Sequence, residues 1–439
     1  MTGRTKILKG FSWLMGEKVV GAGTTFLSMI IVARYYGPAD FGTLSFALSL
    51  TSLFAVSGNF GLNGLVVKEC LDRPDSWRSV LATAFVLKLI GYAVAMVIVI
   101  SMAFATPNLT AYDRWVVIFM AVSLLPRPYE VLDYWLQGRH NFRDGAIART
   151  VMQVAGAILR AGLSFLEIPL PWIAGTFILQ YAGLTIAYVV IVRRYAAGAL
   201  AITNYSKALA KDLTGRGVFL FVGAILATVN LKIDQVMINA MLGKTHVGHY
   251  AVAASISEAW YFFPVALTSV VFPYLIKGRA SSQECFYRQM QSLTDLLFTT
   301  ALIAAIIVTF SAHVIIESLY GPQYAAAAEI LIVHIWSAIF IFMRTAFSKW
   351  ILIEGALKFS MLSHGLGAIA NVGLNYFLIP KFGAIGAAYA TLVSYAMSSY
   401  IVLLLHKDMR PVFKMMTRSI LLPFRIPDAL ANIAEQRKA

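Results

Sequence analysis

The stretch Arg34-Tyr-Tyr-Gly-Pro-Ala-Asp-Phe-Gly42 joins two long apolar segments, and a related stretch, Leu242-Gly-Lys-Thr-His-Val-Gly248, follows 206 positions later. At that offset the glycines at 37 and 42 match the glycines at 243 and 248, and the apolar segments beyond the two turns also correspond. Self-similarity at nearly half the chain length is the pattern of an internal duplication. The sequence therefore predicts two halves of similar architecture, arranged as a parallel repeat.

The composition indicates an all-α polytopic membrane protein. Of the 439 residues 59% are hydrophobic and 13% are charged, with a mean hydropathy of +0.73. Soluble domains carry about 25% charged residues, and a soluble fold of this length could not bury so much apolar surface. The first apolar segment is too long for a cleavable signal and lacks a small-residue cleavage motif, so we expect it to be the first membrane span.

Windows of about 20 apolar residues predict twelve membrane helices, six in each half. We therefore expect an N-terminal six-helix lobe at 1–194, a cytoplasmic basic linker at 195–216 and a C-terminal six-helix lobe at 217–405. A basic tail at 406–439 mixes apolar and basic residues, as interfacial helices on anionic leaflets do. The predicted spans are 8–33, 42–66, 79–105, 115–137, 146–168, 172–193, 217–241, 248–275, 294–318, 325–350, 358–379 and 383–405.

The basic residues predict the orientation in the membrane. With the N-terminus inside, the inner segments hold 25 lysines and arginines, whereas the outer loops hold only Arg34, Arg114, Lys244 and Lys381. This bias predicts that both termini are cytoplasmic. The net charge of +15 is therefore explained by basic residues that orient the protein in the membrane, and we expect no nucleic-acid partner.

Signals for enzymes, metals and cofactors are absent from the sequence. The two cysteines, Cys70 and Cys285, lie far apart in predicted loops, and the seven histidines lack metal-ligand spacing. No Gly-x-x-x-x-Gly-Lys-Ser/Thr phosphate loop occurs, and no Ser/His/Asp, paired-carboxylate or Cys/His constellation fits the predicted topology. We expect neither catalysis nor a bound metal or cofactor.

Charged groups at membrane depth are costly and must face protein or water, so they are the candidate functional residues. Arginine forks suit phosphate oxygens, and we expect cations to bind the anionic part of a substrate and acids to couple transport or line a cavity. The alternative is ion pairing within the membrane, such as Arg127 with Glu130 or Arg160 with Glu167. The cations are Lys18, Arg34, Arg127, Arg149, Arg160, Lys232 and Arg344, and the acids are Glu17, Glu130, Asp234 and Glu258; Lys88 and Lys349 are expected to be structural or to snorkel.

Helical spacing orders these candidates. Arg149 and Arg160 lie on one stripe of the fifth span at 100° per residue. Thr24 and Ser28 of the first span match Asn230 and Asp234 of the seventh at the 206-residue offset. Two matching polar faces predict that these spans face one another across a shared cavity. The prolines at 126 and 128 predict a break in the fourth span.

Four segments carry a family resemblance. They are Lys6-Ile-Leu-Lys-Gly-Phe-Ser-Trp13, Ile31-Val-Ala-Arg-Tyr-Tyr-Gly-Pro-Ala-Asp-Phe-Gly42, Phe60-Gly-Leu62 and Pro380-Lys-Phe-Gly-Ala-Ile-Gly-Ala-Ala-Tyr-Ala-Thr391. Together they resemble the polysaccharide biosynthesis flippases (Wzx-type O-antigen and exopolysaccharide) of the MOP superfamily, over nearly the whole chain.

The resemblance implies two lobes around a central cavity lined by helices one and seven. It implies transfer of undecaprenyl-diphosphate-linked oligosaccharide from the cytoplasmic to the periplasmic leaflet of a bacterial cytoplasmic (inner) membrane. An ion gradient or membrane potential would drive alternating access. A polysaccharide polymerase and a chain-length regulator are candidate partners, and a monomer would suffice.

Four alternatives remain open, and one of them, the lipid II flippase of the same superfamily, typically has two extra C-terminal helices that the predicted topology lacks. A MATE-type cation-coupled multidrug exporter of the same superfamily should have a cavity dominated by carboxylates, whereas cations are comparably frequent here. An O-antigen polymerase or ligase usually has a large periplasmic loop, which the predicted topology lacks. A structural membrane scaffold has no need of duplicated intramembrane charge.

Overall fold

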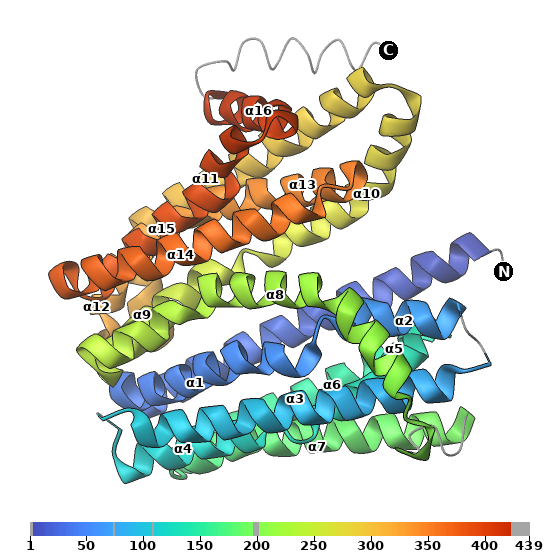
Figure 1. The fold of residues 1–439 in the computed structure, drawn as a ribbon. Helices are drawn as coiled ribbons and strands as arrows, with labels where there is room; N and C mark the ends of the chain where they lie inside the picture. Colours follow the sequence, from blue (N-terminus) through green and yellow to red (C-terminus); the bar gives the residue numbers. More distant parts are fainter. Residues whose placement is uncertain (1–2, 73–74, 108, 140, 196–201, 423–439) are drawn as a thin grey trace.

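The computed structural model describes residues 3–72, 75–107, 109–139, 141–195 and 202–422, and every regular element in these ranges is a helix. Figure 1 shows two bundles, the N-lobe (α1–α7) and the C-lobe (α9–α16), with α8 along their boundary. The prediction of an all-α, two-lobe membrane protein is confirmed. The N-lobe helices are α1 (Gly3–Asn59), α2 (Leu62–Asp72), α3 (Trp77–Ala105), α4 (Ala111–Val122), α5 (Val131–Gly138), α6 (Phe142–Phe165) and α7 (Leu170–Tyr195).

The long helix α8 (Lys207–Leu242) packs against α1 of the N-lobe and against α14 of the C-lobe. Each of the twelve predicted spans lies largely on helix, and turns interrupt several of them, such as residues 123–126 in the fourth span. Ten stretches within the described ranges are long and apolar enough to cross a membrane, and the first holds two predicted spans. The C-lobe helices are α9 (Lys244–Ala259), α10 (Phe262–Ser281), α11 (Gln283–Tyr320), α12 (Ala326–His334), α13 (Ser337–Glu354), α14 (Leu357–Phe382), α15 (Ala384–Ser399) and α16 (Arg410–Ile420).

The two duplicated turns share one backbone geometry. Gly37, where α1 bends into its second half, has φ 72° and ψ 177°, and Gly243, between α8 and α9, has φ 89° and ψ 174°. This conformation is accessible to glycine and strained for residues with a side chain. We call the end of the molecule that holds these turns the turn end, and the opposite end, which holds the start of α1, the terminal end.

The linker boundary predicted at 216 and 217 falls inside α8, which begins at Lys207. Ser206 caps the helix by accepting a hydrogen bond from the Leu209 amide, and Leu213 is buried. Arg216 pairs with Glu69 of α2 at 2.8 Å. The basic residues of the predicted linker suggested a loop. Its second part instead contains helix-forming residues with a buried face, which extend α8 along the N-lobe. Residues 196–201 of the predicted linker lie outside the described ranges.

The predicted interfacial tail contains α16, whose apolar face is covered by protein. Val412 and Met416 are buried in a core cluster with residues of α11, and Gln291 of α11 donates to the Met415 carbonyl at 3.1 Å. An amphipathic sequence indicates only that one face will be covered, by lipid or by protein. Here the apolar face packs on α11. Tail residues 423–439 lie outside the described ranges.

Candidate functional site

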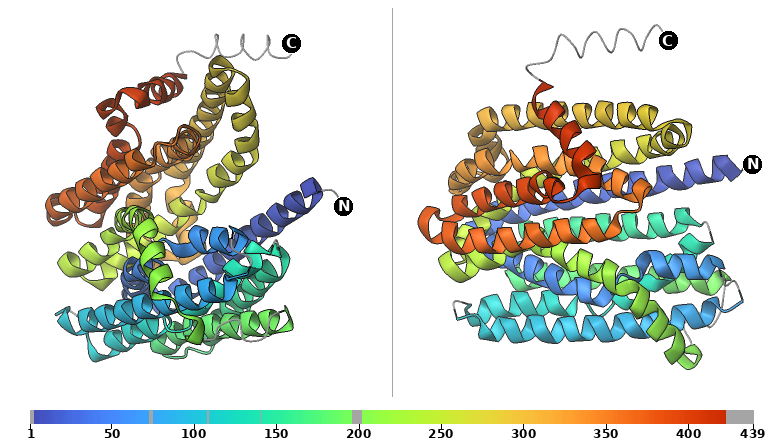
Figure 2. Two further views of the ribbon diagram at one scale, coloured as in Figure 1. Left: turned by 45° about the vertical axis from the view of Figure 1, so that its right-hand side comes forward. Right: turned by 45° about the horizontal axis from the view of Figure 1, so that its top comes forward.

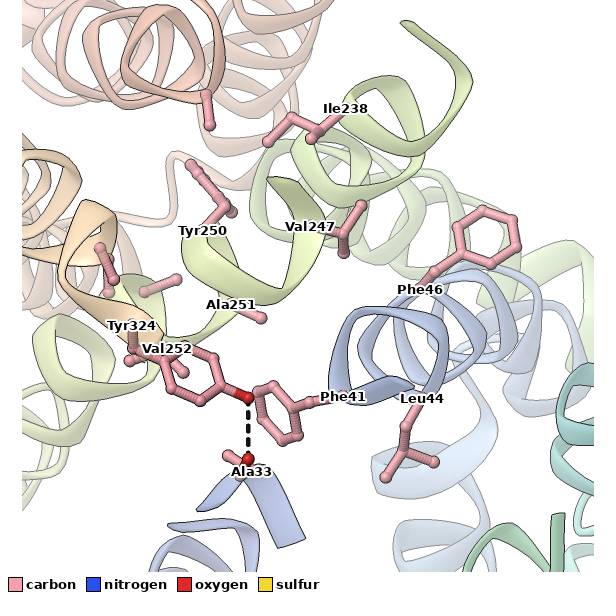
Figure 3. Close-up of a cluster of buried hydrophobic side chains, with 14 of the residues drawn as sticks. Ala33, Phe41, Leu44, Phe46, Ile238, Val247, Tyr250, Ala251, Val252 and Tyr324 are labelled. Atoms are coloured by element: carbon pink, nitrogen blue, oxygen red, sulfur yellow. Dashed lines mark hydrogen bonds between the residues drawn. The ribbon is translucent and has the colours of Figure 1, made fainter. Parts of the chain in front are cut away.

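The two lobes are sealed against each other at the turn end. Figure 3 shows aromatic and aliphatic side chains of both lobes converging there, among them Phe41 and Phe46 of α1 with Val247 of α9. The Tyr324 hydroxyl donates to the Ala33 carbonyl at 2.9 Å across this interface. Figures 1 and 2 show the start of α1 and the α10–α11 hairpin diverging toward the terminal end.

Two glycines make this seal possible. A Cβ on Gly42 would overlap the Lys244 carbonyl, and a Cβ on Gly248 would overlap the Pro38 carbonyl. Positions 38 and 244, like 42 and 248, are related by the 206-residue offset, so each lobe presents the same patch to the other. This reciprocity is the property of a two-fold interface. It explains why the glycine spacing recurs in the sequence.

An ion pair between a half-buried lysine and a buried carboxylate spans the same interface. Lys244 of α9 lies 2.9 Å from Asp113 of α4, and Asp113 also accepts a hydrogen bond from Thr43 at 3.0 Å. Arg34, predicted to bind substrate, is exposed here and donates to the Ser318 carbonyl at 3.3 Å. The structure thus places Arg34 at the seal, apart from the other candidate cations.

Arg149 of α6 lies between two carboxylates. Its guanidinium is 2.5 Å from Asp133 of α5 and 3.0 Å from Glu17 of α1, and it also donates to the Tyr188 hydroxyl at 3.3 Å. All three ionised groups are largely buried. Arg149 and Glu17, two of the predicted candidates, therefore form an ion-pair cluster with Asp133 that joins α1, α5 and α6.

A second cluster surrounds the broken fourth span. Pro126 and Pro128 flank Arg127 in a 3₁₀ turn, as predicted, and the turn places Arg127 3.5 Å from Glu130. Lys88 of α3 is 0% exposed, lies 3.4 Å from Glu130 and donates to the Tyr134 hydroxyl at 2.9 Å. Lys88 is therefore structural and does not snorkel. Two cations share one carboxylate, which leaves the cluster positive.

Arg160 is the most enclosed arginine of the N-lobe. It is 1% exposed, donates to Gln180 at 3.0 Å and lies 4.4 Å from the Phe177 ring centroid. The alternative of an ion pair with Glu167 is wrong, because Arg160 donates to Gln180 and Glu167 lies beyond the end of α6. Among the described residues no carboxylate pairs with Arg160.

In the C-lobe, Asp234 is 2% exposed and is held by neutral groups. It accepts hydrogen bonds from the Tyr250 hydroxyl at 2.7 Å, from the Thr391 hydroxyl at 2.7 Å and from the Asn375 amide at 2.5 Å. These partners come from α9, α15 and α14. No salt bridge to Asp234 occurs in the described ranges, so this network retains a negative charge when Asp234 is ionised.

The predicted meeting of the polar faces of spans one and seven is wrong, although α8 does pack against α1. Asn230 bonds to Ser394 at 3.2 Å, so both polar residues of α8 point into the C-lobe. Thr24 and Ser28 donate to carbonyls of their own helix. The spacing of polar residues shows which of them share one face of a helix, but it does not show which other helix packs against that face. The structure adds Asn371 and Asn375, whose four-residue spacing in an apolar segment was an available signal.

The remaining candidates are dispersed. Lys232 pairs with Glu258 at 3.2 Å, and both are half-buried. Arg344 is buried in the C-lobe, where it donates to Ser363 at 2.9 Å and to the Ser398 carbonyl at 2.7 Å. Lys18 is exposed on α1. Among described residues, neither Lys18 nor Arg344 has a carboxylate partner.

A family model described as "Polysaccharide biosynthesis protein" matches residues 7–279. The chain belongs to this family. Over 395 residues it is 23% identical to the probable low-salt glycan biosynthesis flippase Agl15 of Haloferax volcanii, covering 87% of this chain and 79% of Agl15. It is 21% identical to the lipid III flippase of Escherichia coli, covering 89% and 95% of the two chains. The predicted resemblance is confirmed at the level of the family.

Solved structures confirm the fold. The lipid II flippase MurJ in an inward closed conformation superposes with a TM-score of 0.68 at 14% identity, covering 96% of this chain and 93% of MurJ. An inward-facing multidrug resistance MATE transporter of the MOP superfamily gives 0.66 at 14% identity, covering 90% and 95%. The family member described here therefore has the two-lobe MOP fold.

Proposed function

We propose that this protein is a flippase that moves undecaprenyl-diphosphate-linked oligosaccharide from the cytoplasmic to the periplasmic leaflet of a bacterial inner membrane. Its family and the names of its relatives support a glycan lipid as the substrate class. In this orientation both termini are cytoplasmic and the turn end faces the periplasm. The reaction is transport, with no bond made or broken.

The observation that carries the proposal is the combination of a sealed end with cations that lack carboxylate partners. The seal at Gly42 and Gly248 closes the periplasmic side. Toward the cytoplasm, α1 exposes Lys18, Val20 and Leu27. An exposed cation beside apolar side chains suits a diphosphate whose lipid tail remains in the bilayer.

Transport by alternating access requires the seal to open while the cytoplasmic side closes. Lys18 would meet the diphosphate first, and the surplus positive charge around Arg127 and the unpaired Arg160 favour the anion within the N-lobe. The paired residues Arg149, Glu17, Lys232 and Glu258 would hold helices together within their lobes. Arg344 would position α13 against α14 and α15.

Coupling to an ion gradient or to the membrane potential is assigned to Asp234. Its three neutral donors orient the carboxylate without neutralising it, so a coupling proton or cation can complete the charge balance. A polysaccharide polymerase and a chain-length regulator are the partners expected downstream of the product. One chain contains both lobes, so a monomer suffices.

The decisive experiment deletes the gene in its host and assigns lipid-linked oligosaccharides to each leaflet. We expect one undecaprenyl-linked repeat unit to accumulate on the cytoplasmic face and the surface glycan to be lost, with both defects reversed by the intact gene. If both glycan pools were unchanged and sensitivity to cationic dyes rose, the protein would be a multidrug exporter instead.

A further inference from the structure

A groove of about 580 Å³ lies at the terminal end, between α10 and α11 of the C-lobe. Val271 and Tyr274 of α10 line one wall, and Arg288, Ser292 and Leu296 of α11 line the other. No residue of the candidate functional site contributes to it. The groove is therefore a separate feature that transport of the glycan does not explain.

The position of the groove along the membrane normal matches that of the lipid headgroups. The 38-residue helix α11 is about 57 Å long at 1.5 Å per residue, whereas a bilayer measures about 40–45 Å with its headgroups. Counted from Tyr320 at the turn end, Leu296 lies about 36 Å and Arg288 about 48 Å along the helix. These positions bracket the headgroup layer on the terminal side.

An apolar track leads into the groove from the membrane. Ile303, Ile307, Phe310 and Val314 of α11 are each more than half exposed and lie on the same helix face as Leu296. Tyr274 and Val270 of α10 are also exposed. A continuous apolar strip that ends among polar groups is the surface that an acyl chain with its headgroup fits.

The polar end of the groove holds one charge of each sign. Arg288 lies 3.3 Å from Glu284, and both are exposed. Their charges balance, which favours a headgroup with no net charge over an anionic one. The Glu284 carboxylate is exposed, so it can accept hydrogen bonds from a ligand that carries N–H donors.

We propose that this groove binds phosphatidylethanolamine of the leaflet on the terminal side. Its phosphate accepts hydrogen bonds from Arg288, its ammonium group donates to Glu284, and one acyl chain follows Leu296 toward Ile303. Phosphatidylcholine lacks the N–H donors, and phosphatidylglycerol carries an uncompensated negative charge. The transported glycan plays no part in this site.

Native mass spectrometry of the full chain in detergent tests the site with three probes: phosphatidylethanolamine, phosphatidylglycerol and phosphatidylcholine. We expect wild-type protein to retain one phosphatidylethanolamine preferentially. Leu296→Trp, which fills the groove, and Arg288→Gln should each lower that retention severalfold. Val97→Trp is the matched control, because it adds the same bulk to an exposed apolar position of α3 in the other lobe, away from the groove and its apolar track, and it should retain lipid like wild type.

Glu284→Gln tests the charge balance of the groove separately, because it leaves Arg288 as the only charged residue among those that line the groove. We expect this variant to prefer phosphatidylglycerol. Equal retention in wild type, Leu296→Trp and Val97→Trp would overturn the site. Wild-type retention of phosphatidylcholine or phosphatidylglycerol at the level of phosphatidylethanolamine would overturn the headgroup assignment. Melting curves of each variant in lipid-free detergent identify any loss of lipid that follows from unfolding.

Discussion

The N-lobe and the C-lobe begin from the same turn and meet through the same patch, yet their buried polar groups differ. In the N-lobe, the carboxylates of the candidate site contact cations, as with Asp133 and Glu17 on either side of Arg149. In the C-lobe, Asp234 is surrounded by hydroxyl and amide donors alone. The contrast indicates that the duplicated interface constrained the backbone, while the lobe interiors were free to acquire different chemistry.

Removing the N-lobe's central cation should have the largest effect on stability. Arg149→Met leaves Asp133 and Glu17 without their counter-charge, and breaking a largely buried ion pair costs about 3–5 kcal/mol. Melting in detergent should show a large loss of stability, whereas Lys232→Met, at the half-buried pair of the C-lobe, should cost less. Asp133→Asn combined with Arg149→Met should recover part of the loss. Equal losses of stability in Arg149→Met and Lys232→Met would contradict the view that the N-lobe depends more strongly on its buried ion pairs.

The shared interface can be tested at one of its glycines. Gly248→Ala forces a methyl group against the Pro38 carbonyl, and overpacking of this kind costs about 1–3 kcal/mol. We expect cysteine cross-linking across the turn end to fall and glycan transport to drop at least severalfold. Gly223→Ala is the control, because its Cβ would meet open space. Unchanged cross-linking in Gly248→Ala would show that the contact does not hold the lobes together.

In the C-lobe the informative change is Asp234→Asn, which keeps the shape and removes the charge. Three donors lose a charged acceptor, which costs about 1–3 kcal/mol. Transport into proteoliposomes should lose its response to an imposed ion gradient or potential. Asp212→Asn, at an exposed acid of the same helix, should keep that response. A gradient response that survives in Asp234→Asn would assign coupling elsewhere.

The smallest effect on stability is expected at Lys18. The side chain is exposed and pairs with no described carboxylate, so Lys18→Gln should change stability by less than about 0.5 kcal/mol. Because it would contact the diphosphate, the variant should need a higher substrate concentration for half-maximal transport. Lys18→Arg should restore wild-type behaviour. An unaltered concentration dependence in Lys18→Gln would remove Lys18 from the substrate path.

Local features of the site were predictable from the sequence, and long-range partners were not. The Arg127–Glu130 pair follows from a three-residue spacing. By contrast, Lys88 meets Glu130 across 42 positions, and Arg149 meets Glu17 across 132. Helical periodicity assigns each residue to a face, but the neighbour of that face depends on how the bundle packs.

The sequence by itself determined the membrane class, the helical spans and the two glycine turns, because hydrocarbon thickness and backbone sterics act on local segments. Only the tertiary structure decided that Asp234 faces Asn375 and Thr391 rather than α1, and that α16 packs on α11. It also revealed why the turn glycines recur: the repeated spacing brings Gly42 and Gly248 each against the opposite lobe's backbone. Such choices depend on which helices lie side by side, and a helix's own residues do not specify its neighbours.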